Sequence, residues 1–156
     1  REVKQWFDGT VILSGSIGDG HSVASAIALG ADFAYLGTRF IATEEANAEP
    51  EYKKMLEESA AKDIVYSSLF TGVLGNYLKP SIENAGMDPE NLPDADKTSM
   101  NFGSGGNTDS KAWKDIWGSG QGIGGIQDSP TVSELVGRLK KEYEEAFNEF
   151  KSKMGV

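Results

Sequence analysis

Two short apolar runs near the N-terminus each end at a glycine and are followed by a helical pattern. The first run covers residues 10–15 and the second covers residues 33–37. Between them, residues 21–29 carry apolar side chains at helical spacing, and Gly30 is placed to end that helix. A strand, a helix and a strand in this order predict two parallel strands joined by a crossover, as in an α/β barrel or a doubly wound sheet.

The pattern after the second run is less regular. It predicts helices over residues 38–45 and 50–61, and a short strand or extended segment over residues 63–67. Pro80 is placed to start or break a helix. Residues 86–110 are rich in glycine, asparagine and proline, and they predict a long loop of the kind that is usually functional or disordered.

The C-terminus carries the clearest helical pattern. Thr131 and Glu134 have the spacing of a capping box. From Val132 to Met154 apolar residues recur every three or four positions, which predicts an amphipathic helix of about six turns. We expect this apolar stripe to pack in the core.

Composition limits the class of protein and its partners. The chain has 156 residues, 38% of them apolar and 25% charged, which is typical of a folded domain. A net charge of −9 argues against nucleic acid or an anionic membrane as the main partner. The absence of cysteine excludes disulfides and thiolate chemistry and favours a cytoplasmic protein, and no apolar run is long enough to span a membrane. Residues 1–7 have the pattern of the end of a helix, so we expect the chain to be part of a longer protein.

Candidate chemistry lies where the two apolar runs end. Ser14, Gly15 and Ser16 follow the first run, and Gly37 and Thr38 follow the second. Glycine lets a backbone approach an anion closely, and exposed N–H groups and hydroxyls bind phosphate without a cation. The two turns therefore indicate a phosphate site, with the alternative that each glycine only ends a strand.

Two other features give weaker signals. Residues 120–125 match the glycine spacing of a dinucleotide fingerprint, but the segment before them is too short and polar to be the strand that this motif needs. We interpret residues 118–125 as a flexible loop that enters the last helix. His21 is the only histidine, and without an evident partner it is interpreted as a surface residue. Chemistry alone identifies no catalytic residue.

The glycine turns and their surroundings resemble the nitronate monooxygenase family, flavoproteins formerly called 2-nitropropane dioxygenases. The resemblance is carried by residues 13–20, 28–32 and 36–44, and it continues through residues 100–103, residues 111–121 and the last helix. It covers nearly the whole chain but only the C-terminal half of the family's protein. It implies an α/β fold, the C-terminal portion of an FMN-binding (β/α)8 TIM barrel, with a helical and loop-rich insertion before the last helix.

The resemblance also implies a division of the chain. Residues 1–45 would be the seventh strand, a helix and the eighth strand, which form the phosphate-binding part of the barrel. Residues 46–128 would be the insertion, and residues 129–156 the final barrel helix.

The resemblance assigns candidate residues to the FMN site. Gly15 and Ser16 would hold the FMN phosphate from one side, and Gly37 and Thr38 from the other. Relatives often have a second glycine where this chain has Ser16. Gln121, together with Ser119, would lie near the flavin ring. No metal site is expected, and the family's catalytic histidine would lie upstream of this chain.

The activity implied is the oxidation of alkyl nitronates with O2. The alternatives are a related FMN barrel enzyme, either an enoyl reductase or an NADH:quinone reductase, and a non-catalytic fragment that associates with a partner or with itself. The expected partners are a small nitronate-like substrate, O2, the N-terminal half of the same protein and a second copy in a homo-oligomer. Neither nucleic acid nor a membrane is expected.

Overall fold

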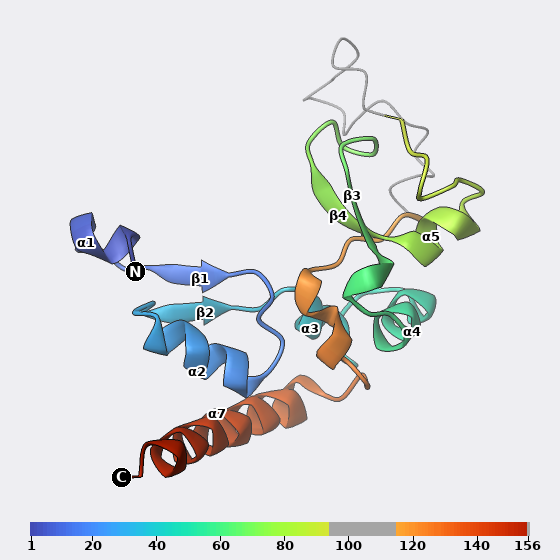
Figure 1. Cartoon of the computed structure of the whole chain (residues 1–156). Helices are drawn as coiled ribbons and strands as arrows, with labels where there is room; N and C mark the ends of the chain where they lie inside the picture. Colours follow the sequence, from blue (N-terminus) through green and yellow to red (C-terminus); the bar gives the residue numbers. More distant parts are fainter. Residues whose placement is uncertain (94–114, 156) are drawn as a thin grey trace.

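The structure is a computed structural model that describes residues 1–93 and 115–155 (Figure 1). The described part of the chain has an α/β fold. Its elements in chain order are α1 (Val3–Trp6), β1 (Ile12–Ser14), α2 (Gly20–Ala28), β2 (Phe33–Tyr35), α3 (Thr38–Ile41), α4 (Pro50–Glu58), the 3-10 helix η1 (Ala61–Asp63), β3 (Ile64–Ser67), β4 (Gly75–Leu78), α5 (Lys79–Asn84), the 3-10 helix η3 (Gln121–Gly125) and α7 (Val132–Met154).

The predicted strand–helix–strand unit is confirmed. β1 and β2 are parallel, with Ile12 opposite Phe33, and α2 forms the crossover between them. The strands are shorter than the apolar runs predicted. At their N-terminal ends the Asp32 carboxylate accepts hydrogen bonds from the Val11 N–H at 2.7 Å and from Lys4 Nζ at 3.0 Å. Gly30 has a φ of +97°, the left-handed conformation that lets a chain leave a helix.

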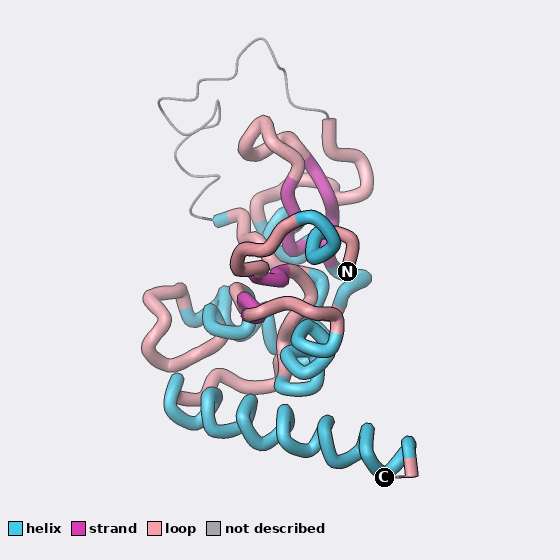
Figure 2. Tube along the Cα trace, turned by 90° about the vertical axis from the view of Figure 1, so that its left-hand side faces the viewer, coloured by secondary structure: helices cyan, strands magenta, loops and turns pink. Residues whose placement is uncertain are grey.

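Helix α7 lies along the bottom of the molecule in both views and packs against α2 (Figures 1 and 2). The capping box is confirmed: the Glu134 N–H donates to Thr131 Oγ1 at 3.2 Å, and the Thr131 N–H donates to Glu134 Oε2 at 3.0 Å. Gly20 lies directly against the backbone of α7. A Cβ at this position would lie 2.2 Å from the Leu139 carbonyl oxygen, so no larger residue fits there without moving α7.

The expectation that the whole apolar stripe of α7 packs in the core is wrong. Leu135 is 1% exposed, but Phe147 is 48% exposed and Phe150 is 62% exposed. The reason is the gap between the helices: α2 lies beside the C-terminal half of α7, but the two leave an open apolar groove. Ala24 and Ala28 line it from one side, and Phe147 and Phe150 line it from the other.

The segment between α3 and η3 contains a second, antiparallel strand pair. β3 pairs with β4, with Ile64 opposite Leu78. The strand predicted over residues 63–67 is confirmed, whereas the sequence did not predict its partner β4. Pro80 lies in the first turn of α5, as expected. The helices predicted over residues 38–45 and 50–61 end earlier than expected, at Ile41 and Glu58, and most of the predicted loop over 86–110 lies outside the described residues.

The two clusters of buried apolar side chains lie around the segment from α3 to the residues after η3 rather than around the parallel strands. One buried cluster joins α3, α4, β4 and η3, and a second joins β4 and α5. The first contains Ala42, Leu56, Leu78, Ile123 and Ile126, and the second contains Phe70, Tyr77, Ile82 and Ile116.

One face of the parallel pair is open by contrast. Ile12 is 58% exposed and its neighbour Phe33 is 60% exposed, although both are large and apolar. Within the described residues, no helix is both long enough and apolar enough to cross a membrane.

Candidate functional site

A small cavity of about 150 Å³ lies at the C-terminal ends of β1 and β2. We call it the strand-end pocket. Three segments line it: the turn after β1, the start of α3, and residues 120–126, which we call the η3 segment. The lining residues are Ser14, Gly15, Ser16, Ile17, Gly18, Tyr35, Gly37, Thr38, Arg39, Gly120, Gly122 and Ile126.

The first wall is the turn after β1, where Gly15 and Ser16 both have positive φ. The φ of Gly15 is +96° and that of Ser16 is +57°. Among the described residues, Ser16 is the only non-glycine with a positive φ, a conformation that costs roughly 1–2 kcal/mol for an L-residue with a side chain. A positive φ is a conformation that glycine adopts without this cost. Such an outlier is most often retained at a functional site.

The second wall is the turn after β2. A Cβ at Gly37 would have no heavy atom within 4 Å, and the same is true at Gly15, so the backbone at both turns borders open space. The Thr38 Oγ1 atom accepts a hydrogen bond from the Gly120 N–H at 2.8 Å. Since the hydroxyl acts as acceptor in this bond, it keeps its hydrogen to donate into the pocket.

The third wall is the η3 segment, and here the interpretation of residues 118–125 as a flexible loop is wrong. Residues 121–125 form a 3-10 helix whose Ile123 is fully buried, and Ile126 is 2% exposed. The glycine spacing has a steric reason unrelated to a dinucleotide fingerprint. A Cβ at Gly122 would lie 3.0 Å from the Ser16 carbonyl carbon, so glycine allows the η3 segment to lie directly on the turn after β1.

The residues before the η3 segment are held by β4 and by Tyr52 of α4. Gly118 forms an isolated antiparallel bridge with Tyr77. Tyr52 donates its hydroxyl hydrogen to the Gly118 carbonyl and stacks on Trp117, with ring centroids 5.0 Å apart. Burial raises the pKa of Tyr52 to about 12, so the phenol stays protonated as a donor at neutral pH. These contacts help to place the η3 segment over the C-terminal ends of β1 and β2.

The structure brings together four of the five residues that the sequence assigned to the FMN site. Gly15, Ser16, Gly37 and Thr38 all line the strand-end pocket. Gln121 is exposed on η3 and is not among the lining residues, so its place near the flavin ring stays a prediction.

Ser119 and His21 lie outside the pocket lining. Ser119 is 7% exposed, and its hydroxyl donates to the Gly120 carbonyl at 3.2 Å. His21 lies at the start of α2, on the surface as expected. Its Nε2 is 3.9 Å from a carboxylate oxygen of Glu149, at the edge of an apolar groove between α2 and α7.

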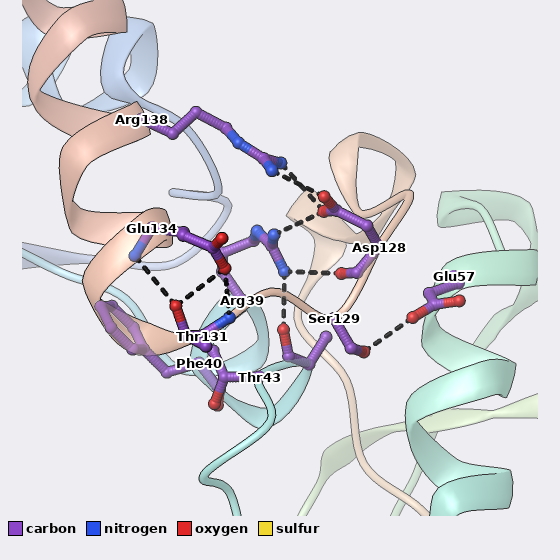
Figure 3. A network of polar contacts seen from close by, with 10 residues as sticks. Arg39, Phe40, Thr43, Glu57, Asp128, Ser129, Thr131, Glu134 and Arg138 are labelled. Atoms are coloured by element: carbon purple, nitrogen blue, oxygen red, sulfur yellow. Dashed lines mark hydrogen bonds and ion pairs between the residues drawn. The ribbon is translucent and has the colours of Figure 1, made fainter.

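Sequence reasoning missed one polar network beside the pocket. Arg39 is only 3% exposed, and its Nη2 donates to Asp128 Oδ1 at 2.9 Å (Figure 3). Burial lowers the pKa of the Arg39 guanidinium, while hydrogen bonds from Arg138 lower the pKa of the Asp128 carboxyl below its usual value. The signal available in the sequence was an arginine directly after Thr38, but nothing local pointed to Asp128, which is 89 residues away. In the described part of the chain, no group of three or more histidine or acidic residues could hold a metal ion.

A parallel strand pair with glycine turns and a small pocket at its carboxyl ends is characteristic of α/β proteins that bind ligands at this edge of the sheet. Residues 3–142 match the family model described as nitronate monooxygenase, and the chain belongs to that family.

Individual relatives agree with this assignment. The chain is 30% identical over 146 residues to the nitronate monooxygenase of Paraburkholderia phytofirmans, an alignment that covers 90% of this chain and 40% of that protein. Nitroalkane oxidase from Streptomyces ansochromogenes is similar in structure, with a TM-score of 0.71, 27% identity and coverage of 96% of this chain and 43% of that one. FabK from Thermotoga maritima, with a TM-score of 0.67, 24% identity and coverage of 97% and 49%, shares the fold. The chain therefore spans less than half the length of each.

Proposed function

We propose that the protein containing this chain is an FMN-dependent oxidoreductase that oxidises alkyl nitronates with O2. The observation that carries the proposal is the strand-end pocket, formed by two adjacent glycine turns in a chain that belongs to the nitronate monooxygenase family. In this proposal the pocket binds the phosphate of FMN. Gly15 and Ser16 hold it from one side, and Gly37 and Thr38 hold it from the other.

The residues present fit a phosphate group. Open space borders the backbone at Gly15 and Gly37, so an anion can approach their N–H groups closely. The hydroxyl of Thr38 has its oxygen occupied by the Gly120 N–H and its hydrogen left to donate. The η3 segment lines the pocket on a third side.

When bound, FMN supplies the electron transfer that links oxidation of a nitronate to reduction of O2. This chain's part is to hold the phosphate end and so to fix where the flavin lies. Gln121 extends the site toward the flavin ring in this proposal. A nitronate has already lost the proton that a nitroalkane carries, so a catalytic base serves only for a neutral nitroalkane, and it is expected in the N-terminal half of the protein.

The open face of the parallel strands favours an N-terminal half that completes a barrel. Ile12 and Phe33 share this face and are each more than half exposed. We propose that residues 1–45 are the seventh strand, helix and eighth strand of a (β/α)8 barrel, that residues 46–128 are an insertion, and that the remaining strands cover these side chains. Burial of apolar area of this kind contributes about 25 cal/mol per Å².

The first experiment is an absorbance spectrum of the protein that contains this chain, purified without added flavin, followed by titration with FMN and riboflavin. A flavin spectrum and a clear preference for FMN are expected, because only FMN carries the phosphate. Oxygen consumption is then measured with propionate 3-nitronate. A colourless protein that binds both flavins equally contradicts the proposed phosphate site.

Two alternatives are tested in the same preparation. A related barrel enoyl reductase or NADH:quinone reductase shares the phosphate site, and it is distinguished by activity with NADH and an enoyl thioester or a quinone in place of the nitronate. A non-catalytic association module is favoured if the 156-residue chain forms a stable oligomer and the flavin never binds.

A further inference from the structure

Asp128 is bound by two arginines from different elements, directly after the η3 segment. Arg39 Nη2 donates to its Oδ1 at 2.9 Å, while Arg138 donates from Nη1 to Oδ1 at 2.9 Å and from Nη2 to Oδ2 at 2.6 Å (Figure 3). Arg39 Nη1 also donates to the backbone carbonyl of Asp128 at 3.2 Å. Since the side chain and the backbone of Asp128 are both bonded, the chain at this point is fixed against α3 and α7.

Arg39 connects this network to the strand-end pocket. It follows Thr38 in sequence and lines the pocket itself. Its Nη1 also donates to the Ala42 carbonyl at the end of α3 at 2.9 Å, and the side chain is 3% exposed. A buried guanidinium held in this way is a rigid support, so Asp128 is tied to a fixed point although its own side chain is 44% exposed.

The η3 segment is attached at both of its ends. Before it, the Ser119 N–H donates to the Asn76 carbonyl at 3.2 Å, which ties the chain to β4. After it, Asp128 makes the attachment to Arg39 and Arg138 described above. These two attachments act together with the burial of Ile123 and the Gly120–Thr38 hydrogen bond to hold the segment over the pocket.

The charges around Asp128 allow two effects of a substitution to be distinguished. One is a movement of the η3 segment, and the other is a change in the charge that a bound phosphate meets. Two guanidinium groups surround the Asp128 carboxylate, and Glu134 and Glu142 interact with the same arginines. Neutralising Asp128 removes one negative charge beside the pocket, so electrostatics alone would strengthen the binding of a phosphate. Loss of the attachment would instead let the η3 segment move away and weaken the binding of a phosphate. The two effects have opposite signs.

We propose that Asp128 is a positioning residue for the strand-end pocket. Its carboxylate, held between Arg39 and Arg138, keeps the η3 segment against Ser16 and Thr38 and thereby sets the preference for a flavin that carries a phosphate. This inference rests on the proposed FMN site.

The test compares Asp128→Asn with Asp32→Asn in the protein that contains this chain. Asp32 is a matched control, because it also binds a basic side chain and a second donor but lies at the opposite, N-terminal end of the strands. FMN and riboflavin are titrated separately by fluorescence, and unfolding midpoints are measured in parallel. The ratio of the two affinities is the informative readout, because a general loss of stability lowers both affinities together.

Asp128→Asn is expected to lower the affinity for FMN about tenfold, roughly what one hydrogen bond to a charged group contributes, and to leave the affinity for riboflavin unchanged. Asp32→Asn is expected to keep the wild-type ratio, and Asp128→Glu, which keeps the charge, to restore part of it. Asp128→Glu provides the result if Asp128→Asn does not fold, because it keeps the charge and any remaining loss of the preference for FMN is then positional.

Two outcomes overturn the inference and leave the proposed function standing. In the first, wild type prefers FMN and Asp128→Asn keeps the same preference. In the second, Asp128→Asn binds FMN more tightly than wild type does. A wild-type protein without any preference for FMN overturns both the proposed function and the inference.

Discussion

Substituting alanine for Gly122 tests directly whether the η3 segment must lie on the turn after β1. A Cβ at Gly122 would be 3.0 Å from the carbonyl carbon, 3.1 Å from the carbonyl oxygen and 3.2 Å from the Cα of Ser16. All three are backbone atoms, which cannot turn aside as the end of a flexible side chain can. The η3 segment must therefore lift from the turn, and overpacking of this kind costs about 1–3 kcal/mol.

Gly124 offers a matched control in the same 3-10 helix. A Cβ there would meet no heavy atom within 4 Å, and neither glycine has a positive φ. Alanine restricts the unfolded chain equally in both variants, a gain of about 0.4–1 kcal/mol where the native conformation accepts it. Because this gain cancels in the comparison, Gly122→Ala should be less stable than Gly124→Ala by about 1–3 kcal/mol.

The assay is denaturant unfolding of both variants, together with FMN and riboflavin titrations. Gly124→Ala should be slightly more stable than wild type and keep the wild-type preference for FMN. Gly122→Ala should be less stable and lose part of that preference, because the pocket opens on the side of the η3 segment. Equal stabilities and equal FMN affinities for the two variants would refute the proposed contact.

Three further predictions follow from other contacts. Thr38→Val leaves the Gly120 N–H without its acceptor, which should cost about 1–3 kcal/mol in urea unfolding and weaken FMN binding more than riboflavin binding; an unchanged FMN affinity would contradict the assigned role. Gly20→Ala should lower the unfolding midpoint, since its Cβ would lie 2.2 Å from the Leu139 carbonyl oxygen and force α7 away from α2; a wild-type midpoint would show that α7 moves without cost. The pKa of Asp128 is lowered in the folded state, chiefly by Arg138, so its stabilisation is present above the ordinary value of 3.8 and is lost as the pH falls through the lower folded value. The stability difference between wild type and Asp128→Asn should therefore be constant near neutral pH and shrink as the pH falls below about 4, and a difference that does not shrink over this range would contradict this assignment.

Local features of the fold were predictable because each depends on neighbours in sequence. The capping box at Thr131 and Glu134 satisfies backbone groups within one turn, so its residues identify the start of α7 without further information. Gly30 ends α2 because its own backbone adopts a positive φ, which glycine permits. Long-range packing was less predictable: the periodicity of α7 indicated an apolar face but not that an open groove between α2 and α7 leaves Phe150 exposed.

The candidate site also has parts that the sequence predicted and parts that it did not. Gly15, Ser16, Gly37 and Thr38 were found from the sequence because the carboxyl ends of adjacent parallel strands must lie at the same edge of a sheet. The contacts of the η3 segment with the two glycine turns and the Arg39–Asp128 pair were not found, because the hydrogen bonds that make them join residues 82 to 89 positions apart, which no local pattern records.

The sequence by itself determined the strand–helix–strand unit, the two glycine turns and the family, since these depend on periodicity, backbone conformation and short motifs. Only the tertiary structure decided that the glycines at 120 and 122 lie on those turns, and that a buried arginine connects α3 to Asp128. The physical reason is that secondary structure is specified by side chains a few positions apart, whereas a pocket needs steric fit and charge pairing between segments that only folding brings together.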